Sequence, residues 1–273
     1  MSAAAAGIVL AGGGSARMGT PKAALEWHGS TLVHRVAGIL LRALAGPVVV
    51  VRAPGQPLPR LPAACEVVED ARADRGPLEG LARGLAALAG RAEVAFVAST
   101  DLPLLHPAFV AAVVHWLGDG DDICVPVLHD RPQLLAAAYR TAVAPEIDGL
   151  LAADRLRLGL LVDCCRVRRL QAGDLLAEPR LAAADPGLLS ALNLNRPEDY
   201  AAARALPAPE ISVRRPPGGA EVVRAATLAR AAATVGLVPD RGPIVATLNG
   251  RPAGEDPQLP LAAGDELVFA AQE

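Results

Sequence analysis

Short aliphatic runs alternate with longer, helix-like segments over the first two-thirds of the chain. The aliphatic runs are bounded by Gly, Pro or Asp, as expected for buried strands. They cover residues 7–10, 48–51, 66–69, 94–99 and 123–127. Apolar side chains at helical spacing fill residues 31–44, 78–88 and 107–117. This alternation predicts an α/β fold, a doubly wound and mostly parallel sheet with helices on both faces and a ligand site beyond the carboxyl ends of its strands.

The pattern changes after a stiff proline-rich break, L-P-A-P, at residues 206–209. Beyond it, strand-like segments at 211–214, 221–224, 244–248 and 267–270 surround one helix-like segment at 227–235. Asn249-Gly250 is a strong signal for a two-residue hairpin turn. We therefore expect two domains, a large α/β domain over residues 1–206 and a small α+β domain of the β-grasp type over residues 210–273.

The amino-acid composition of the chain argues against some classes of binding partner. Of the 273 residues, 52% are hydrophobic but only 3% are aromatic, and the net charge is −3. A single-stranded nucleic-acid binder needs aromatic platforms and clustered positive charge, so we expect no nucleic-acid partner. No apolar run is long enough to span a bilayer, and the four cysteines lack C-x-x-C spacing. We expect a cytoplasmic protein with free thiols and no membrane association.

Lys22 is the only lysine among the 26 basic residues. A lysine ammonium is a compact point charge that fits between phosphate oxygens, where the broad guanidinium fork of arginine does not. Lys22 follows a strand and three successive glycines, whose backbone N–H groups can approach a phosphate chain closely. A solvated lysine on an exposed face is the alternative, but the glycine-rich segment before it independently favours a phosphate contact.

The segment L-A-G-G-G-S-A-R-M-G-T-P-K, residues 10–22, resembles the signature of molybdenum cofactor guanylyltransferases, within the wider nucleotidyltransferase family. It is neither the dinucleotide fingerprint nor a P-loop, which needs Gly-Lys-Ser/Thr. The resemblance implies catalytic roles for Arg17 and Lys22. It also implies nucleotide contacts from the strand end and the loop, at Leu10, Ala11, Gly12, Gly13, Gly14 and Lys22.

Later segments match the same family in the same order, so the resemblance covers roughly residues 7–204. V-V-E-D at 67–70 resembles the strand-end aspartate of the family, which makes Asp70 a nucleotide contact. G-P-L-E-G at 76–80 resembles its helix start and adds Gly76 to the nucleotide site. The tripeptide R-P-Q at 131–133 resembles a weaker family segment that faces the acceptor.

S-T-D-L-P at 99–103 resembles the family's C-D-x-P motif, which makes Asp101 a catalytic, nucleotide-binding and metal-binding residue. The implied cofactor is Mg²⁺, which takes one or two protein carboxylates and completes its shell with phosphate and water. On this segment alone, a turn aspartate capping the next helix is an alternative. N-L-N-R-P-E-D at 193–199 resembles N-x-N-T-P-E-D and implies acceptor or metal contacts from Asn193 and Asn195, although Asn before such a helix is often a cap.

The resemblance implies that the chain joins GMP from GTP to the terminal phosphate of molybdopterin and releases pyrophosphate. Because a phosphate monoester is already largely ionised at neutral pH, we expect no catalytic His or Ser. The residues leave open a molybdopterin cytidylyltransferase, another phosphorylated acceptor such as a sugar phosphate, and a non-catalytic nucleotide-binding scaffold.

The C-terminal segment resembles sulfur-carrier β-grasp proteins of molybdopterin and thiamine synthesis, through L-N-G-R-P at 248–252 and L-A-A-G-D-E-L at 261–267. Those proteins act through a terminal Gly-Gly, whereas this sequence reads A-A-Q-E at 270–273. We therefore expect no sulfur transfer. Three roles stay open: docking onto other cofactor-synthesis proteins, docking onto the chain's own catalytic domain, or a neutral remnant of a gene fusion.

Overall fold

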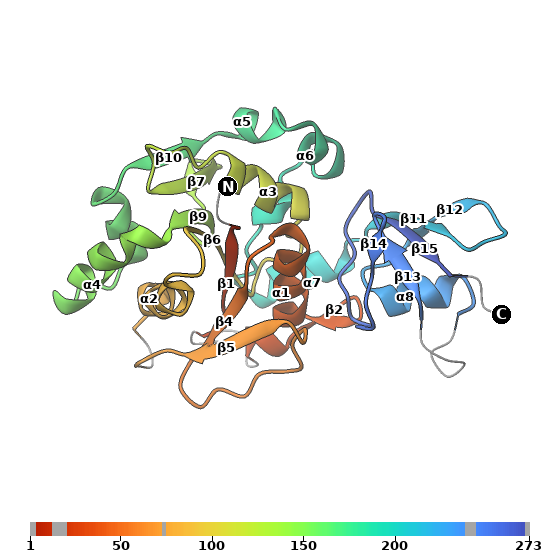
Figure 1. Cartoon of the computed structure of the whole chain (residues 1–273), viewed down its shortest axis with the longest axis horizontal. Coiled ribbons are helices and arrows are strands. Elements are labelled where there is room, and N and C mark those ends of the chain that lie inside the picture. Colours follow the sequence, from red (N-terminus) through yellow and green to blue (C-terminus); the bar gives the residue numbers. More distant parts are fainter. Residues whose placement is uncertain (1–3, 13–20, 73–74, 238–243, 271–273) are drawn as a thin grey trace.

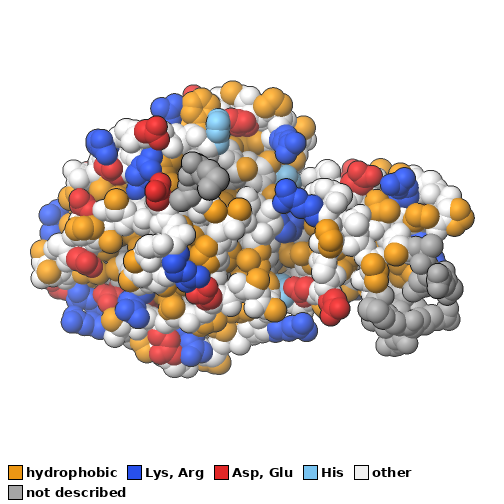
Figure 2. Space-filling model, viewed as in Figure 1, with side chains coloured by type: hydrophobic (Ala, Val, Ile, Leu, Met, Phe, Trp, Pro, Cys, Tyr) orange, Lys and Arg blue, Asp and Glu red, His pale blue; other side chains and the backbone are white. Residues whose placement is uncertain are grey.

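The computed structural model describes residues 4–12, 21–72, 75–237 and 244–270. Within these residues the chain forms two separate main sheets and the helices that cover them (Figure 1). Figure 2 shows a larger and a smaller lobe joined by a narrower waist. Acidic and basic side chains are interspersed over this face rather than gathered into one charged patch.

The large sheet has the strand order β10-β7-β9-β6-β1-β4-β5, and β8 extends it by pairing with β7. Only β9 and β8 run against the others among these strands. The mixed but mostly parallel sheet confirms the predicted fold class. The strands are β1 Ala6–Leu10, β4 Val48–Arg52, β5 Cys65–Glu69, β6 Val94–Ser99, β7 Ile123–Leu128, β8 Arg131–Pro132, β9 Ala136–Arg140 and β10 Val167–Leu170. A separate hairpin joins β2 Glu26–Trp27 to β3 Ser30–Thr31.

Strand β1 is central and fully buried, between β4 and β6. Its side chains alternate between the two faces of the sheet, as strand geometry requires. Ile8 and Leu10 pack in one hydrophobic cluster, and Val9 packs in the other. A strand covered on both faces reads as a continuous aliphatic run, which is why the sequence pattern located it.

Helices cover both faces of the large sheet. On one face lie α1 Leu32–Ala43 and α3 Pro107–His115, and on the other lie α2 Pro77–Leu88 and α4 Ala144–Ala152. Gly84 lets α2 approach β1 closely, because a Cβ there would lie 2.7 Å from Ile8 Cγ2. The remaining helices of this part are α5 Ala172–Leu176, α6 Pro179–Ala184 and α7 Pro197–Ala205, with short 3₁₀ turns at Lys22–Ala24, Thr141–Val143, Leu158–Asp163 and Leu189–Ala191.

The C-terminal part forms a five-stranded sheet with the order β12-β11-β15-β13-β14. Its elements are β11 Glu210–Arg214, β12 Ala220–Arg224, α8 Leu228–Thr234, β13 Ala246–Leu248, β14 Arg251–Pro252 and β15 Glu266–Phe269. Asn249 and Gly250 both have positive φ in the β13–β14 turn, as the hairpin prediction requires. Phe269 and Leu228 help to form a hydrophobic core that belongs to this region alone.

No helix in the described part of the chain is both long enough and apolar enough to cross a membrane. The four cysteines are all free. Cys124 on β7 is fully buried and packs as a small core residue.

Candidate functional site

The carboxyl ends of four neighbouring parallel strands bring the predicted site residues to one edge of the large sheet. Ala11 follows β1, and its N–H donates to Val51 O on β4 at 2.8 Å. Asp70 follows β5, and its N–H donates to Arg52 O at 2.9 Å. Asp101 follows β6, whose last residue is the register partner of Leu10. This edge is where parallel α/β sheets bind their ligands.

Lys22 and Asp101 meet in this region. The Nζ atom of Lys22 donates to Oδ2 of Asp101 at 2.7 Å, and the two side chains are 24% and 13% exposed. The Ser99 hydroxyl donates to the other carboxylate oxygen of Asp101. The carboxylate is therefore held in a defined orientation by two donors, one charged and one neutral. Sequence reasoning identified Lys22 and Asp101 but did not identify Ser99.

Gly12 lies close to Asp70 and to Ala53, the first residue after β4. A Cβ on Gly12 would lie 3.2 Å from both the Ala53 nitrogen and Asp70 Oδ2. A Cβ on Gly80, in the second turn of α2, would lie 3.2 Å from Leu10 Cδ2. The structure thus brings together Leu10, Gly12 and Asp70, three of the predicted nucleotide contacts. It also explains the need for a residue without a side chain at position 12.

Asp70 is electrostatically unusual. Its Oδ1 atom is buried and has no hydrogen-bond partner among the described residues. Burial, and secondarily the nearby charge of Glu79, raises the pKa of Asp70 from 3.8 to about 6. A buried carboxylate oxygen without a donor fits a side chain that accepts a hydrogen bond from a ligand.

Gly76 precedes α2 and has a φ of +77°, a conformation that favours glycine. Pro77 then occupies the first turn of the helix, where its missing N–H costs nothing. The atom nearest to a Cβ on Gly76 would be Leu156 O, at 3.8 Å, in the loop after α4. The positive φ therefore explains why glycine is favoured at position 76, and its nucleotide contact stays a prediction.

The segment that carries Asn193 and Asn195 also reaches this region. The Leu194 N–H donates to Asp101 O at 3.0 Å, which joins the two segments through their backbones. The Asn193 side chain donates to Gln133 Oε1 at 3.2 Å, so the structure brings together two segments predicted to face the acceptor. At Asn195 it is the backbone N–H that is used, and it donates to Asp199 Oδ2 at 3.0 Å, as in a helix cap.

Gln56 is a second residue that sequence reasoning did not identify. Its Nε2 donates to Ala11 O at 3.0 Å, and its Oε1 accepts from the Ala53 N–H at 3.0 Å. Both halves of the amide are used, so Gln56 fixes the backbone just before Gly12. Arg52, left out of the predicted site, donates to Gln56 O and to Glu69.

The loop residues Gly13, Gly14 and Arg17 lie outside the described residues. Among the residues that the structure does describe, no group of three or more His, Cys, Asp or Glu side chains is placed to hold a metal ion. A magnesium ion does not need such a group, because it commonly binds one or two carboxylates and takes its other ligands from phosphate and water. The oriented carboxylate of Asp101 fits that requirement.

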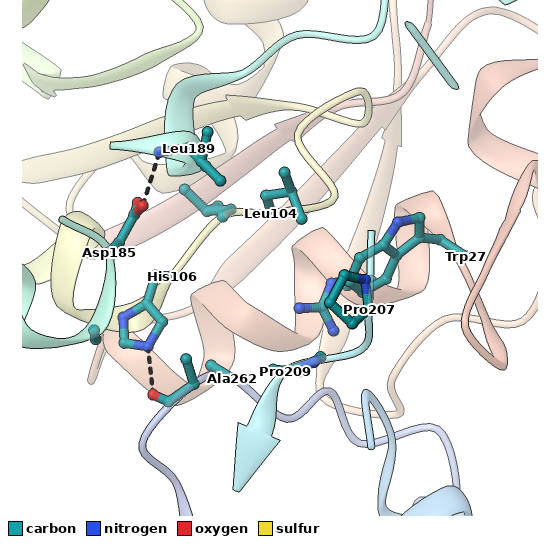
Figure 3. Close-up of a pocket in the computed structure, with 12 residues that line it drawn as sticks. Trp27, Leu104, His106, Asp185, Leu189, Pro207, Pro209 and Ala262 are labelled. Carbon is teal, nitrogen blue, oxygen red and sulfur yellow. Dashed lines mark hydrogen bonds between the residues drawn. The ribbon is translucent and has the colours of Figure 1, made fainter. Parts of the chain in front are cut away.

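A cavity of about 150 Å³ lies elsewhere, at the junction of the two sheet regions (Figure 3). His106 and Asp185 lie on one side of it and Trp27 on another, with Pro207 and Pro209 between them. The side chains of His106 and Asp185 already form hydrogen bonds within the chain. His106 Nε2 contacts Ala263 O at 3.0 Å, and the Asp185 carboxylate accepts from two backbone N–H groups and one hydroxyl. Burial lowers the pKa of His106, which favours a neutral, structural imidazole.

Comparison with known proteins identifies the family of the chain. Residues 7–162 match the family described as MobA-like NTP transferase domain. A protein of Mycolicibacterium paratuberculosis named probable molybdenum cofactor guanylyltransferase is 40% identical over 161 residues, which cover 58% of this chain and 80% of that protein. Its namesake from Mycobacterium tuberculosis H37Rv is 40% identical over 172 residues, covering 62% and 84%.

Solved structures show the same fold. Molybdopterin-guanine dinucleotide biosynthesis protein A of Archaeoglobus fulgidus aligns with a TM-score of 0.58 at 20% identity, covering 73% of this chain and 96% of that one. The 2-C-methyl-D-erythritol 4-phosphate cytidylyltransferase of Thermus thermophilus aligns with a TM-score of 0.53 at 20% identity, covering 75% and 98%. The chain belongs to the family of MobA-like NTP transferase domains, and it is an enzyme, a nucleotidyltransferase.

Proposed function

We propose that this nucleotidyltransferase transfers GMP from GTP to the terminal phosphate of molybdopterin and releases pyrophosphate. The single observation that carries the proposal is the Lys22–Asp101 contact at the carboxyl edge of the sheet. This contact joins a compact cation to a carboxylate, the type of group that binds metal ions, just beyond the end of β6, the strand that neighbours β1. The 40% identity to proteins named probable molybdenum cofactor guanylyltransferase supports the choice of donor and acceptor.

The proposed reaction depends more on aligning the acceptor phosphate with GTP than on removing a proton from the acceptor. A terminal phosphate oxygen of the acceptor attacks the α-phosphorus of GTP, and a new P–O bond forms. The bond between the α-phosphorus and its bridging oxygen to the β-phosphate breaks, and that oxygen leaves with the electron pair as pyrophosphate. The second pKa of a phosphate monoester is about 6, so the nucleophile is already ionised at neutral pH. No general base is needed from the chain.

The chain's own residues would align and neutralise the phosphates. Lys22 and Arg17 would offset the charge that builds on the leaving pyrophosphate. The backbone N–H groups of Gly12, Gly13 and Gly14 would cradle the phosphate chain. Asp70 would accept a hydrogen bond from the nucleoside, through the buried oxygen that has no donor among the described residues.

Asp101 would hold the magnesium ion. When bound, this ion would supply a positive charge that neutralises phosphate oxygens. Ser99 would keep the carboxylate of Asp101 correctly oriented through its hydroxyl. On the acceptor side, the pair of Asn193 and Gln133 would contact molybdopterin, with Asn195 nearby.

We also propose two domains, residues 1–206 for nucleotidyl transfer and residues 210–273 as a β-grasp domain. The strand order β12-β11-β15-β13-β14 around the single described helix α8 supports the second assignment. Other cofactor-synthesis proteins are candidate partners of this domain. A cytoplasmic location suits an enzyme that consumes GTP and whose four cysteines are free.

The decisive experiment offers the purified chain molybdopterin, Mg²⁺ and either GTP or CTP labelled at the α-phosphate. The proposal predicts that label from GTP enters the pterin product, with one pyrophosphate released for each transfer. Preferential transfer from CTP would identify a cytidylyltransferase instead. Tight GTP binding without any transfer to molybdopterin would favour a nucleotide-binding scaffold or a different acceptor.

A further inference from the structure

Arg35, on α1, is a buried cation at the junction of the two sheet regions. The residue is only 3% exposed. Its guanidinium carbon lies over the Trp27 ring, 4.3 Å from the ring centroid, in a cation–π contact. Among the described residues, no carboxylate forms an ion pair with it. Its hydrogen bonds go to backbone carbonyls instead.

These carbonyls come from two different parts of the chain. Arg35 Nε donates to Pro103 O, two residues after Asp101. Nη1 donates to Ala226 O at 3.2 Å, and Nη2 donates to Leu261 O at 3.2 Å. Ala226 and Leu261 both belong to the C-terminal region. The planar guanidinium of Arg35 therefore links the segment that carries Asp101 to the C-terminal sheet region, a role that suits the fixed fork of arginine.

The C-terminal region is docked on the same face of α1 by closely fitted contacts. Arg42 donates to Pro260 O at 2.6 Å and to Asp265 Oδ1 at 2.6 Å. A Cβ on Gly38 would lie 2.6 Å from Pro260 Cδ, so the helix and the proline ring are in direct contact. His34 is fully buried at this junction, and its Nε2 is 2.8 Å from Asp256 Oδ2.

The segment that Arg35 holds is itself packed tightly around the site. Leu102 and Leu105 are almost completely buried. The Asp101 carbonyl accepts the Leu194 N–H at 3.0 Å. If the C-terminal region moved away, the guanidinium would lose two of its carbonyl partners and become accessible to water. The hydrogen bond to Pro103 O would then weaken as Arg35 turned towards water.

We propose that the C-terminal region is an intrachain positioning element for Asp101, and that Arg35 is the positioning residue through which it acts. Docking on α1 completes the set of carbonyls around Arg35, which keeps the segment from Asp101 to Pro103 in place. The proposal rests on the proposed function only where Asp101 is taken to bind the metal. It assigns the C-terminal region a role in catalysis that needs neither sulfur transfer nor another protein.

Gly38→Ala is the sharpest test, because the added methyl group meets the Pro260 ring and touches no catalytic residue. Gly149→Ala in α4 is the matched control, since a Cβ there meets nothing within 4 Å. Arg35→Lys keeps the charge but removes the fork. For each full-length variant, two quantities are measured: hydrogen exchange of the Leu194 amide, and the Mg²⁺ concentration that gives half-maximal transfer at saturating GTP and acceptor.

We expect Gly38→Ala and Arg35→Lys to speed exchange at Leu194 and to raise the Mg²⁺ requirement about tenfold, the size of one lost hydrogen bond to a charged group. Gly149→Ala should match the unaltered chain in both measurements. Values for Gly38→Ala and Arg35→Lys equal to those of Gly149→Ala would overturn the proposal. If the unaltered chain transferred no GMP, the proposed function would fail, but the exchange measurement would still decide whether the C-terminal region holds this segment.

Discussion

The Nζ atom of Lys22 lies 2.7 Å from Oδ2 of Asp101, although 79 residues separate them in the sequence. The contact joins the end of the glycine-rich segment to the end of β6. Each group partly neutralises the other. The pair lies at the carboxyl edge of the sheet, where parallel α/β sheets bind their ligands.

Replacing Lys22 with Ala should reduce turnover by about 10²–10³-fold, the cost typical of removing one donor that stabilises transition-state charge. Lys22→Arg should not restore full activity, because the guanidinium is too broad for the position. Stability should change little, since a partly exposed ion pair contributes about 0–1 kcal/mol. Steady-state rates and thermal unfolding of the two variants check this. Normal activity in Lys22→Arg would show that any cation suffices.

Asp101→Asn should abolish the response of the rate to Mg²⁺, because the neutral amide is a poor ligand for a hard cation. Ser99→Ala should have a milder effect and raise the Mg²⁺ requirement without removing it, since only the orientation of Asp101 is lost. Titration of activity with Mg²⁺ distinguishes the two variants. Identical Mg²⁺ curves for Ser99→Ala and the unaltered chain would show that the hydroxyl does not position the acid.

Asp70 should make stability depend on pH with a defined sign. Its folded-state pKa of about 6 exceeds the ordinary 3.8, so between these values the folded chain holds more protons than the unfolded chain. The free energy of unfolding should therefore fall as pH rises from about 4 to about 6, and Asp70→Asn should remove this contribution. Chemical denaturation at several pH values, with Asp119→Asn as an exposed control, measures it.

The same carboxyl should impose the opposite trend on ligand binding. If ionised Asp70 accepts a hydrogen bond from the nucleoside, GTP affinity should increase as pH rises through about 6. In Asp70→Asn, GTP should bind more weakly at neutral pH, and this rise should be lost. Calorimetric titration with GTP at pH 5 and pH 7.5 provides the comparison. A pH-independent affinity in the unaltered chain would exclude Asp70 from the nucleotide site.

Gln56→Ala should weaken GTP binding more than it slows the chemical step. The variant loses the two hydrogen bonds that fix the backbone of Ala11 and Ala53 beside Gly12. We expect KM for GTP to rise about fivefold to tenfold, the size of one or two neutral hydrogen bonds, with kcat nearly unchanged. Gln171→Ala, at the start of α5, is the control. A fall in kcat with an unchanged KM would contradict a role in binding.

Much of the fold was predictable because buried parallel strands read as continuous aliphatic runs. The pattern located the buried strands β1, β4, β6 and β7 with small differences at their ends. It also located β5, but that strand lies at the edge of the sheet and is mostly exposed, not buried as expected. The sequence pattern did not predict strand β9, because its sequence A-A-A-Y-R has a composition typical of a helix. Its position between β6 and β7 overrides that local preference, which only the assembled sheet can reveal.

The candidate site also contains some residues that the sequence could identify and others that it could not. Lys22, Asp70 and Asp101 carry local signals, a lone lysine after glycines and acids at strand ends. Gln56 lies in a proline-rich loop and acts on Ala11, 45 residues earlier, so nothing in its own neighbourhood indicates a role. Arg35 likewise resembles any arginine on an amphipathic helix. Its contacts with residues 191 and 226 positions away exist only after the two sheet regions are docked.

Calorimetric titration of GTP into the unaltered chain and into Lys22→Ala and Asp101→Asn, each with and without Mg²⁺, tests whether Lys22 and Asp101 hold GTP and its magnesium ion. We expect one GTP per chain, binding that Mg²⁺ strengthens, a weaker complex in Lys22→Ala, and no strengthening by Mg²⁺ in Asp101→Asn. GTP affinity that is the same in all three proteins, or that does not respond to Mg²⁺ in the unaltered chain, would contradict this expectation.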